Sequence, residues 1–226
     1  MHFNDLMLAS RGAGPVAHYN AVATQMLGHI ERHLAWPAAT PVIDIGSGYG
    51  RFVRHLVDHV TASRIWVCDT DEAAVAFCRA AFGVEGCGSI TGPGTTFPEP
   101  FGLVVALTVL TNLPRPAVEA ITARIADITR PGALVVLTTH GWDSVQRHLP
   151  SYGSQYPALR EHISKALEAE GTCFVQYPHH CDEIGMAWHT PEFVRSLFDE
   201  NRFELVEFIQ AGLDDHQDVH VFRRRT

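Results

Sequence analysis

One stretch constrains the fold of this chain more than any other: residues 42–52, VIDIGSGYGRF. Its first four residues are β-branched and apolar apart from one acid, which predicts a short buried strand. Glycines then occupy every second position, and apolar side chains repeat at helical spacing after them. Strand, glycine turn and helix form the opening of a nucleotide-binding βαβ unit, so the sequence predicts an α/β fold that binds a nucleotide.

The spacing of the glycines indicates which nucleotide is bound. A dinucleotide fingerprint would place its third glycine at position 51, after Gly46 and Gly48, but this chain has Arg51 there. That side chain would crowd a pyrophosphate packed on the turn. With Gly50 the pattern becomes D-x-G-x-G-x-G, which resembles motif I of the class I S-adenosylmethionine (SAM) dependent methyltransferases.

A second feature of that family is an acid at the end of the next strand. Residues 64–69 predict a strand that ends in Asp69, about 20 residues past the glycines, where a carboxylate meets ribose hydroxyls. The resemblance implies that SAM is held by Asp44, Gly46, Ser47, Gly48, Gly50, Asp69, Thr70, Leu107 and Thr108. Within this set, Thr70 would border the adenine, and the last two residues would lie near the methionine part. Asp44 would orient the turn or meet the amino group of SAM through water.

The remaining elements fit the same architecture. We expect strands within residues 42–45, 64–69, 84–90, 101–107, 133–138, 203–209 and 217–223. The short loop between the last two implies an antiparallel hairpin. The expected fold is therefore Rossmann-like and doubly wound, with a mostly parallel seven-stranded sheet and an antiparallel last strand.

The helices complete one expected domain over residues 1–226. A helix over residues 16–34 forms an N-terminal lid within residues 1–40, and residues 141–189 form a substrate-facing insertion with a helix near 158–170 and strands at 172–177 and 185–188. Thr70 and Thr190 are the expected N-caps of two helices. Pro131-Gly132 indicates a turn before strand five.

Three histidines are candidates for the catalytic base. SAM gives up its methyl group by in-line displacement, and a hydroxyl acceptor must also lose a proton, for which histidine is suited near neutral pH. Ligands bind at the carboxyl ends of parallel strands, so His140 after strand five ranks first, ahead of His189 and His216. The alternative for each is a structural hydrogen bond. Asn112 stands where a histidine is common in the similar S-V-L-x-H-L-P segment, and an amide cannot take a proton.

Charge and motifs argue against other partners. The net charge of −8 disfavours nucleic acid, and the sequence has neither the D/N-P-P-Y/F segment of adenine methyltransferases nor the Pro-Cys of cytosine methyltransferases. The ligand-rich run at residues 179–183 has no second pair at zinc spacing, so we expect no metal. Five cysteines without a C-x-x-C pair, no secretory signal and no membrane-spanning run predict a cytoplasmic protein.

The sequence thus predicts a SAM-dependent methyltransferase acting on a hydroxyl of a small molecule or saccharide. The segments at 188–194 and 216–219 resemble methyltransferases found near sugar-modifying genes. Two alternatives stay open: a non-catalytic SAM-binding or regulatory protein, and an N-methyltransferase acting on a small amine. An NAD-linked oxidoreductase conflicts with the glycine spacing. A homodimer is also left open.

Overall fold

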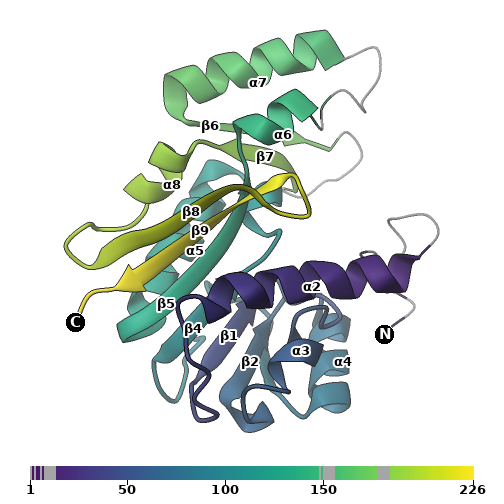
Figure 1. Cartoon of the computed structure of the whole chain (residues 1–226), viewed down its shortest axis with the longest axis vertical. Helices are drawn as coiled ribbons and strands as arrows, with labels where there is room; N and C mark the ends of the chain where they lie inside the picture. The colour runs from purple at the N-terminus through teal and green to yellow at the C-terminus, as the bar shows by residue number, and fades with distance from the viewer. Residues whose placement is uncertain are drawn as a thin grey trace. The chain divides into compact units, whose positions relative to one another are not determined.

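The computed structural model describes residues 2, 4, 5, 7, 14–147, 149, 156–177 and 184–226. They fall into two compact units. The first comprises Met1–Leu107 with Ile128–Val135, and the second comprises Thr108–Asp127 with Val136–Thr226. Figure 1 shows the elements of both, labelled where there is room.

The first unit contains a parallel sheet, as the apolar runs of the sequence predict. Its strands are β1 (Val42–Ile45), β2 (Ile65–Cys68), β3 (Glu85–Cys87) and β4 (Phe101–Ala106). Strand β1 lies between β2 and β4, with Ile45 opposite both Cys68 and Ala106. Because the three strands end in register, the segments that follow them leave the sheet at the same edge.

The helices of this unit match the expected ones in place but differ at their ends. They are α2 (Pro15–Glu31), α3 (Val53–Leu56) and α4 (Glu72–Phe82), with a 3₁₀ turn η1 (Ala62–Arg64). Helix α3 is a single turn. The chain continues to Val60 in further turns, in which the N–H groups of His59 and Val60 donate to the carbonyl of Leu56. Helix α4 ends at Gly83, where φ is +71°.

The expected N-cap of α4 was wrong by one residue. Asp71, not Thr70, adopts the extended cap conformation, and its carboxylate accepts the N–H groups of Ala73 and Ala74. Asp71 is itself held in place, because its own N–H donates to Asp69. Thr70 is exposed. A carboxylate that reaches two N–H donors is a stronger cap than a threonine hydroxyl one position earlier.

Strand β5 (Thr129–His140) runs from the first unit into the second. The turn expected at Pro131-Gly132 is wrong, since both residues lie inside this 12-residue strand. Gly132 has φ of +77°, a conformation that glycine adopts without a steric penalty, so the chain stays extended through the signal. From Ala133 onwards the strand is buried to its end at His140.

The second unit holds the remaining elements of the described residues. These are η2 (Leu110–Asn112), α5 (Arg115–Ile128), α6 (Trp142–Arg147), α7 (Tyr156–Glu170), β6 (Thr172–Gln176), β7 (Gly185–His189), α8 (Pro191–Ser196), β8 (Phe203–Leu213) and β9 (Gln217–Arg224). Strands β8 and β9 form the predicted antiparallel hairpin (Figure 1), and β9 pairs with β5. Thr190 caps α8 through the N–H of Phe193, as predicted.

The insertion forms a small packed layer within this unit. Strand β7 pairs with the end of β5, where His140 faces Trp188, and β6 pairs antiparallel with β7. Helices α6 and α7 lie side by side (Figure 1) over an apolar cluster. The buried members of that cluster are Val145, Leu149, Ile163, Leu167, Cys173 and Trp188.

The predicted fold class is confirmed. The strands follow the order β3-β2-β1-β4-β5, then β9 and β8, which are antiparallel to each other, with β7 and β6 added from the insertion. That a single domain spans residues 1–226 stays a prediction. Within the part of the chain that the structure describes, no helix combines the length and apolar character needed to cross a membrane.

Candidate functional site

Asp69 ties the end of β2 to the glycine turn in the first unit. Its Oδ2 accepts the N–H of Gly48 at 2.7 Å, and its Oδ1 accepts the N–H of Asp71 at 2.9 Å. Both oxygens are therefore fixed in space. Each carboxylate oxygen has a second lone pair, so Asp69 retains the capacity to accept two hydroxyl hydrogen bonds.

The three glycines of the turn serve different purposes. All have positive φ, at +70° for Gly46, +49° for Gly48 and +79° for Gly50. A Cβ on Gly48 would meet no atom within 4 Å, which leaves bare backbone beside open space, whereas a Cβ on Gly50 would lie 2.6 Å from the ring of Phe82. Gly48 thus offers a cradle for a ligand, while Gly50 is required for packing.

Two buried polar groups at the turn favour an incoming ligand. Among the described residues, the hydroxyl oxygen of Ser47 is buried without a hydrogen-bond partner. Asp44 is 2% exposed, and burial raises the pKa of its carboxyl to about 8, although the charge of Arg51 opposes this effect. At neutral pH the Asp44 carboxyl is therefore mostly protonated, and an ammonium group beside it would favour the charged form. Together with the bare Gly48, these groups fit a polar cationic ligand such as the methionine part of SAM.

The other expected cofactor residues lie where the topology puts them. Thr70 is exposed directly after Asp69, and Leu107 is buried directly after β4. From the N-terminal part of this unit, the ring of His2 stacks on Tyr49 of the glycine turn with centroids 4.4 Å apart. Tyr19 on α2 is buried and donates its hydroxyl to Asp5 at 2.5 Å, so its hydroxyl already has a partner. Of the segment expected to fold over the ligand, residues 1, 3, 6 and 8–13 lie outside the described residues.

Two of the three candidate histidines meet in the second unit. The rings of His140, at the end of β5, and His216, before β9, are 5.6 Å apart. His140 Nδ1 donates to the carbonyl of Ala187 at 3.3 Å, and His216 Nδ1 donates to the carbonyl of Asp214 at 2.6 Å. A carbonyl accepts only from a protonated nitrogen, so in each neutral ring Nε2 carries the lone pair that a base needs.

The third candidate, His189, is held by structural hydrogen bonds. Its Nε2 donates to the carbonyl of Leu110 at 3.0 Å, and its Nδ1 accepts from the hydroxyl of Thr172 at 2.8 Å. The side chain is 1% exposed, and burial lowers its pKa to about 4. Both nitrogens are engaged in the core, so the geometry favours the structural alternative for His189.

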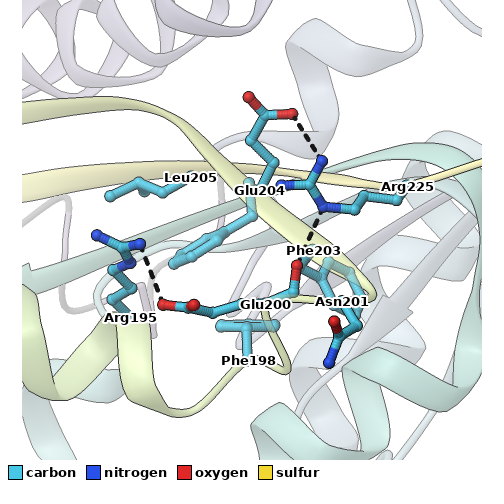
Figure 2. Close-up of a pocket in the computed structure, with 9 residues that line it drawn as sticks. Arg195, Phe198, Glu200, Asn201, Phe203, Glu204, Leu205 and Arg225 are labelled. Carbon is cyan, nitrogen blue, oxygen red and sulfur yellow. Dashed lines mark hydrogen bonds and ion pairs between the residues drawn. The ribbon is translucent and has the colours of Figure 1, made fainter.

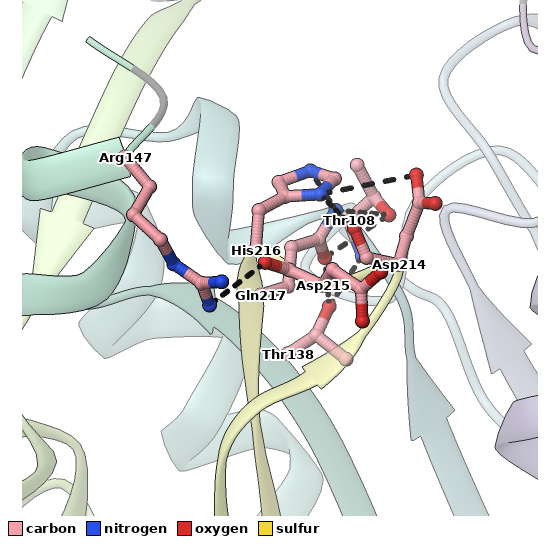
Figure 3. Close-up of polar contacts among 7 residues, drawn as sticks. All are labelled: Thr108, Thr138, Arg147, Asp214, Asp215, His216 and Gln217. Carbon is pink, nitrogen blue, oxygen red and sulfur yellow. Dashed lines mark hydrogen bonds and ion pairs between the residues drawn. The ribbon is translucent and has the colours of Figure 1, made fainter.

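A polar network around Thr108 was not predicted from the sequence. Thr108, Thr138 and Gln217 are mutually hydrogen-bonded next to His216 (Figure 3). Asn112 donates to the carbonyl of Thr108 at 2.6 Å, which gives this amide a structural partner. Gln217 was expected only as the first residue of a strand. The sequence offers little signal for this contact, because β5 and β9 each carry several polar residues and nothing in their order indicates that Thr138 meets Gln217.

A surface pocket in the same unit contains none of the predicted site residues. Its volume is about 470 Å³, and Figure 2 shows its charged rim. Arg195 pairs with Glu200 at 3.0 Å, and Arg225 pairs with Glu204 at 3.6 Å. Since both arginines are paired, the pocket offers no unpaired charge to a ligand.

Residues 179–183, the ligand-rich run of the sequence, lie outside the described residues. Within the described ranges, no three or more side chains of His, Cys, Asp and Glu gather closely enough to hold a metal ion.

Comparison with known proteins agrees with this geometry. Residues 42–132 match the family model described as a methyltransferase domain. No curated protein sequence matches the chain.

Solved structures of methyltransferases share its fold. One from Methanosarcina mazei has 19% identity and a TM-score of 0.60, covering 87% of this chain and 96% of its own. Magnesium protoporphyrin IX methyltransferase from Synechocystis PCC 6803, with bound S-adenosylhomocysteine (SAH), has 13% identity and a TM-score of 0.64, covering 97% and 91%. The N-methyltransferase NodS from Bradyrhizobium japonicum WM9, in complex with SAH, has 14% identity and a TM-score of 0.59, covering 99% and 93%.

Proposed function

We propose that this chain, which belongs to the class I SAM-dependent methyltransferases, transfers the methyl group of SAM to a hydroxyl of a small molecule or saccharide. The observation that supports a hydroxyl acceptor is the pair formed by His140 and His216. Both rings are held by backbone carbonyls in the tautomer whose Nε2 takes up a proton. An alcohol needs such a base, whereas a neutral amine does not need one before the transfer.

Each part of the donor site has a proposed role. Asp69 accepts the ribose hydroxyls, the backbone at Gly46 and Gly48 lies against the ligand, and Thr70 borders the adenine. The hydroxyl of Ser47 donates to the methionine part, beside the Asp44 carboxyl. Leu107 lies near the same part at the end of β4, and Thr108 is assigned to it because it is the next residue in the sequence.

The reaction then requires one proton transfer by the protein. SAM supplies a methyl carbon made electrophilic by the positive sulfonium. The acceptor hydroxyl donates its hydrogen bond to Nε2 of the base, and its O–H bond breaks as the new O–C bond forms. The proton remains on the imidazole, and the electron pair of the broken S–C bond stays on sulfur. Positioning of the acceptor oxygen in line with that bond supplies much of the rate enhancement.

A panel of alcohols, saccharides, phenols and amines incubated with radiolabelled SAM tests this function. We expect transfer to hydroxyls, and His140→Asn, which keeps a donor near the carbonyl of Ala187, should cut turnover more than tenfold. SAH affinity, measured by calorimetry, should change less than twofold. His162→Ala, at an exposed position of α7, is the control.

Other outcomes would count against the proposal. Transfer to amines alone would favour the N-methyltransferase alternative. Tight SAH binding without transfer to any acceptor would favour a non-catalytic SAM-binding protein. A thermal shift with NAD but not with SAH would overturn the donor assignment.

A further inference from the structure

Thr108 has a backbone conformation that a threonine rarely adopts. Its φ is +62°, in the left-handed region where a β-branched side chain clashes with its own backbone. Such a conformation is energetically unfavourable and persists only where its surroundings hold it. Thr108 is the second residue after β4 in the chain. Backbone strain of this kind clusters at functional sites.

Three side chains hold Thr108 in place. Its N–H donates to the hydroxyl of Thr138 at 2.8 Å, and Asn112 donates to its carbonyl. Its own hydroxyl accepts from the Gln217 amide at 3.2 Å. Because the backbone N–H and C=O are both bonded to side chains, Thr108 depends on the network and not on secondary structure.

Gln217 is the centre of this network (Figure 3). Its Oε1 accepts the hydroxyl of Thr138 at 2.7 Å, and its Nε2 donates to Thr108. The same Nε2 lies 3.4 Å from Nε2 of His216. The residue is 4% exposed, so this amide sits in a fixed environment. Only an N–H can face a ring nitrogen that carries a lone pair, and the bond from His216 Nδ1 to Asp214 requires that lone pair.

The hairpin turn places His216 against the network. Asp214 and Asp215 have φ of +53° and +56°, and the N–H of His216 closes the turn onto Leu213. Positive φ at both central positions defines the type I′ turn that suits a two-stranded hairpin. Arg147 on α6 donates to the carbonyl of Asp215 at 3.2 Å and thereby ties the turn to the insertion.

We propose that Gln217 is a positioning residue that holds Thr108 in its left-handed conformation and keeps Nε2 of His216 unprotonated and ready to accept a proton. This inference rests on the proposed function, in which His216 shares the base role with His140. An acceptor hydroxyl would replace the long Gln217 contact at Nε2, while the amide keeps its shorter bonds to Thr108 and Thr138. The charged and titratable groups around His216 are Asp214, with Oδ2 at 3.8 Å from Nδ1, the ring of His140, and Arg147 with Asp215 at the turn.

Gln217→Glu tests the contact with His216 directly. A carboxylate still accepts from Thr138 but cannot donate to Nε2, so it draws a proton onto that nitrogen. Long-range ¹H–¹⁵N NMR of the whole protein at mildly alkaline pH should show an unprotonated Nε2 in the wild type and a protonated one in the variant. Gln210→Glu, the same change at an exposed position of β8, should leave the His216 signals unchanged. An unchanged Nε2 signal in Gln217→Glu, with the fold intact by circular dichroism, overturns the inference.

Hydrogen exchange tests the effect on Thr108. Thr138→Ser keeps the hydroxyl and should preserve slow exchange of the Thr108 N–H. Thr138→Val and Gln217→Leu should each speed that exchange by about fivefold, since each removes a hydrogen bond of the network that holds Thr108. Equal exchange in Thr138→Ser and Thr138→Val would overturn this part.

Turnover separates this inference from the function on which it rests. With an acceptor identified, Gln217→Glu should lower kcat at least tenfold while the KM for SAM changes less than twofold. Unchanged kcat would overturn the role of Gln217 in the reaction and leave the transferase activity standing. Absence of transfer by the wild-type protein would count against the proposed function instead.

Discussion

The carboxylate of Asp69 accepts the backbone N–H of Gly48 at 2.7 Å, so one side chain fixes both the end of β2 and the turn after β1. Its second oxygen holds the N–H of Asp71, which in turn caps α4. The strand, the glycine turn and the helix start are thus joined through a single acid. The donor site and the local fold depend on the same group.

Asp69→Asn should weaken SAH binding by at least tenfold. The amide has a single acceptor oxygen, so it cannot accept from Gly48 and Asp71 together and also bind the ribose with charge. Loss of one hydrogen bond to a charged group costs about 1.5–3 kcal/mol, which corresponds to roughly 10–150-fold in affinity. Calorimetric titration measures the affinity for SAH, and Glu72→Gln, a change at an exposed position, is the control. An affinity within twofold of the wild type would contradict the assignment of Asp69.

Asp44 should make the folded protein less stable as the pH rises. Burial raises the pKa of this carboxyl from its ordinary value of 3.8 to about 8, so the folded chain binds more protons than the unfolded chain between these values. Stability is therefore lost as the pH rises through about 8, by up to about 1.4 kcal/mol per pH unit. Asp44→Asn should lack this loss between pH 6.5 and 8 in urea unfolding. Asp58→Asn, the same change at an exposed position, should keep the wild-type dependence of the unfolding free energy on pH.

His189→Ala should destabilise the fold. It removes a buried ring together with its bonds to Thr172 and Leu110, at a cost of about 2–4 kcal/mol. The pKa of His189 is lowered from 6.5 to about 4, so its stabilising effect is complete above pH 6.5 and is lost as the pH falls through about 4. The stability difference between wild type and variant should therefore narrow towards pH 4. A variant as stable as the wild type at pH 7.5, by urea unfolding, would contradict the structural role.

Gly141→Ala should also destabilise the fold, for a steric reason. A Cβ at Gly141 would overlap the carboxylate of Asp218, which is buried and accepts the N–H of Ala211. Overpacking of this kind costs about 1–3 kcal/mol. Gly88→Ala, where a Cβ meets no atom within 4 Å, is the matched control.

Combining Gly141→Ala with Asp218→Ala tests the cause. Removal of the carboxylate relieves the overlap. The double variant should therefore lose less unfolding free energy than the sum of the losses in the two single variants. If the losses of the two single variants simply add in urea unfolding, the overlap with Asp218 is not the cause of the destabilisation.

Much of the fold follows from patterns that are local in the sequence. The run at 42–45 is β1, and the hairpin of β8 and β9 lies where two expected strands and the short loop between them predicted it. Gly46 and Gly48 take the positive φ that a tight turn after a strand requires. These features are readable because a few neighbouring residues determine strand propensity, turn geometry and the spacing of glycines.

Local patterns also misled where a neighbour decided the outcome. The N-cap of α4 moved from Thr70 to Asp71 because the carboxylate of Asp69 holds the N–H of Asp71. The signal at Pro131-Gly132 did not break β5, since glycine alone absorbed the unusual φ. In each case the sequence pattern is a common helix or turn signal, but the neighbouring residues determined the conformation.

The sequence by itself determined that this chain carries a glycine turn and an acid suited to SAM, and that histidines stand at the ends of its later elements. Only the tertiary structure decided which histidines have carbonyl partners that leave Nε2 to accept a proton, and that His189 serves the core. It alone brought Gln217 to Thr108, 109 residues away in the chain. Hydrogen bonds across such separations depend on strand pairing and burial, and no short window of sequence contains that information.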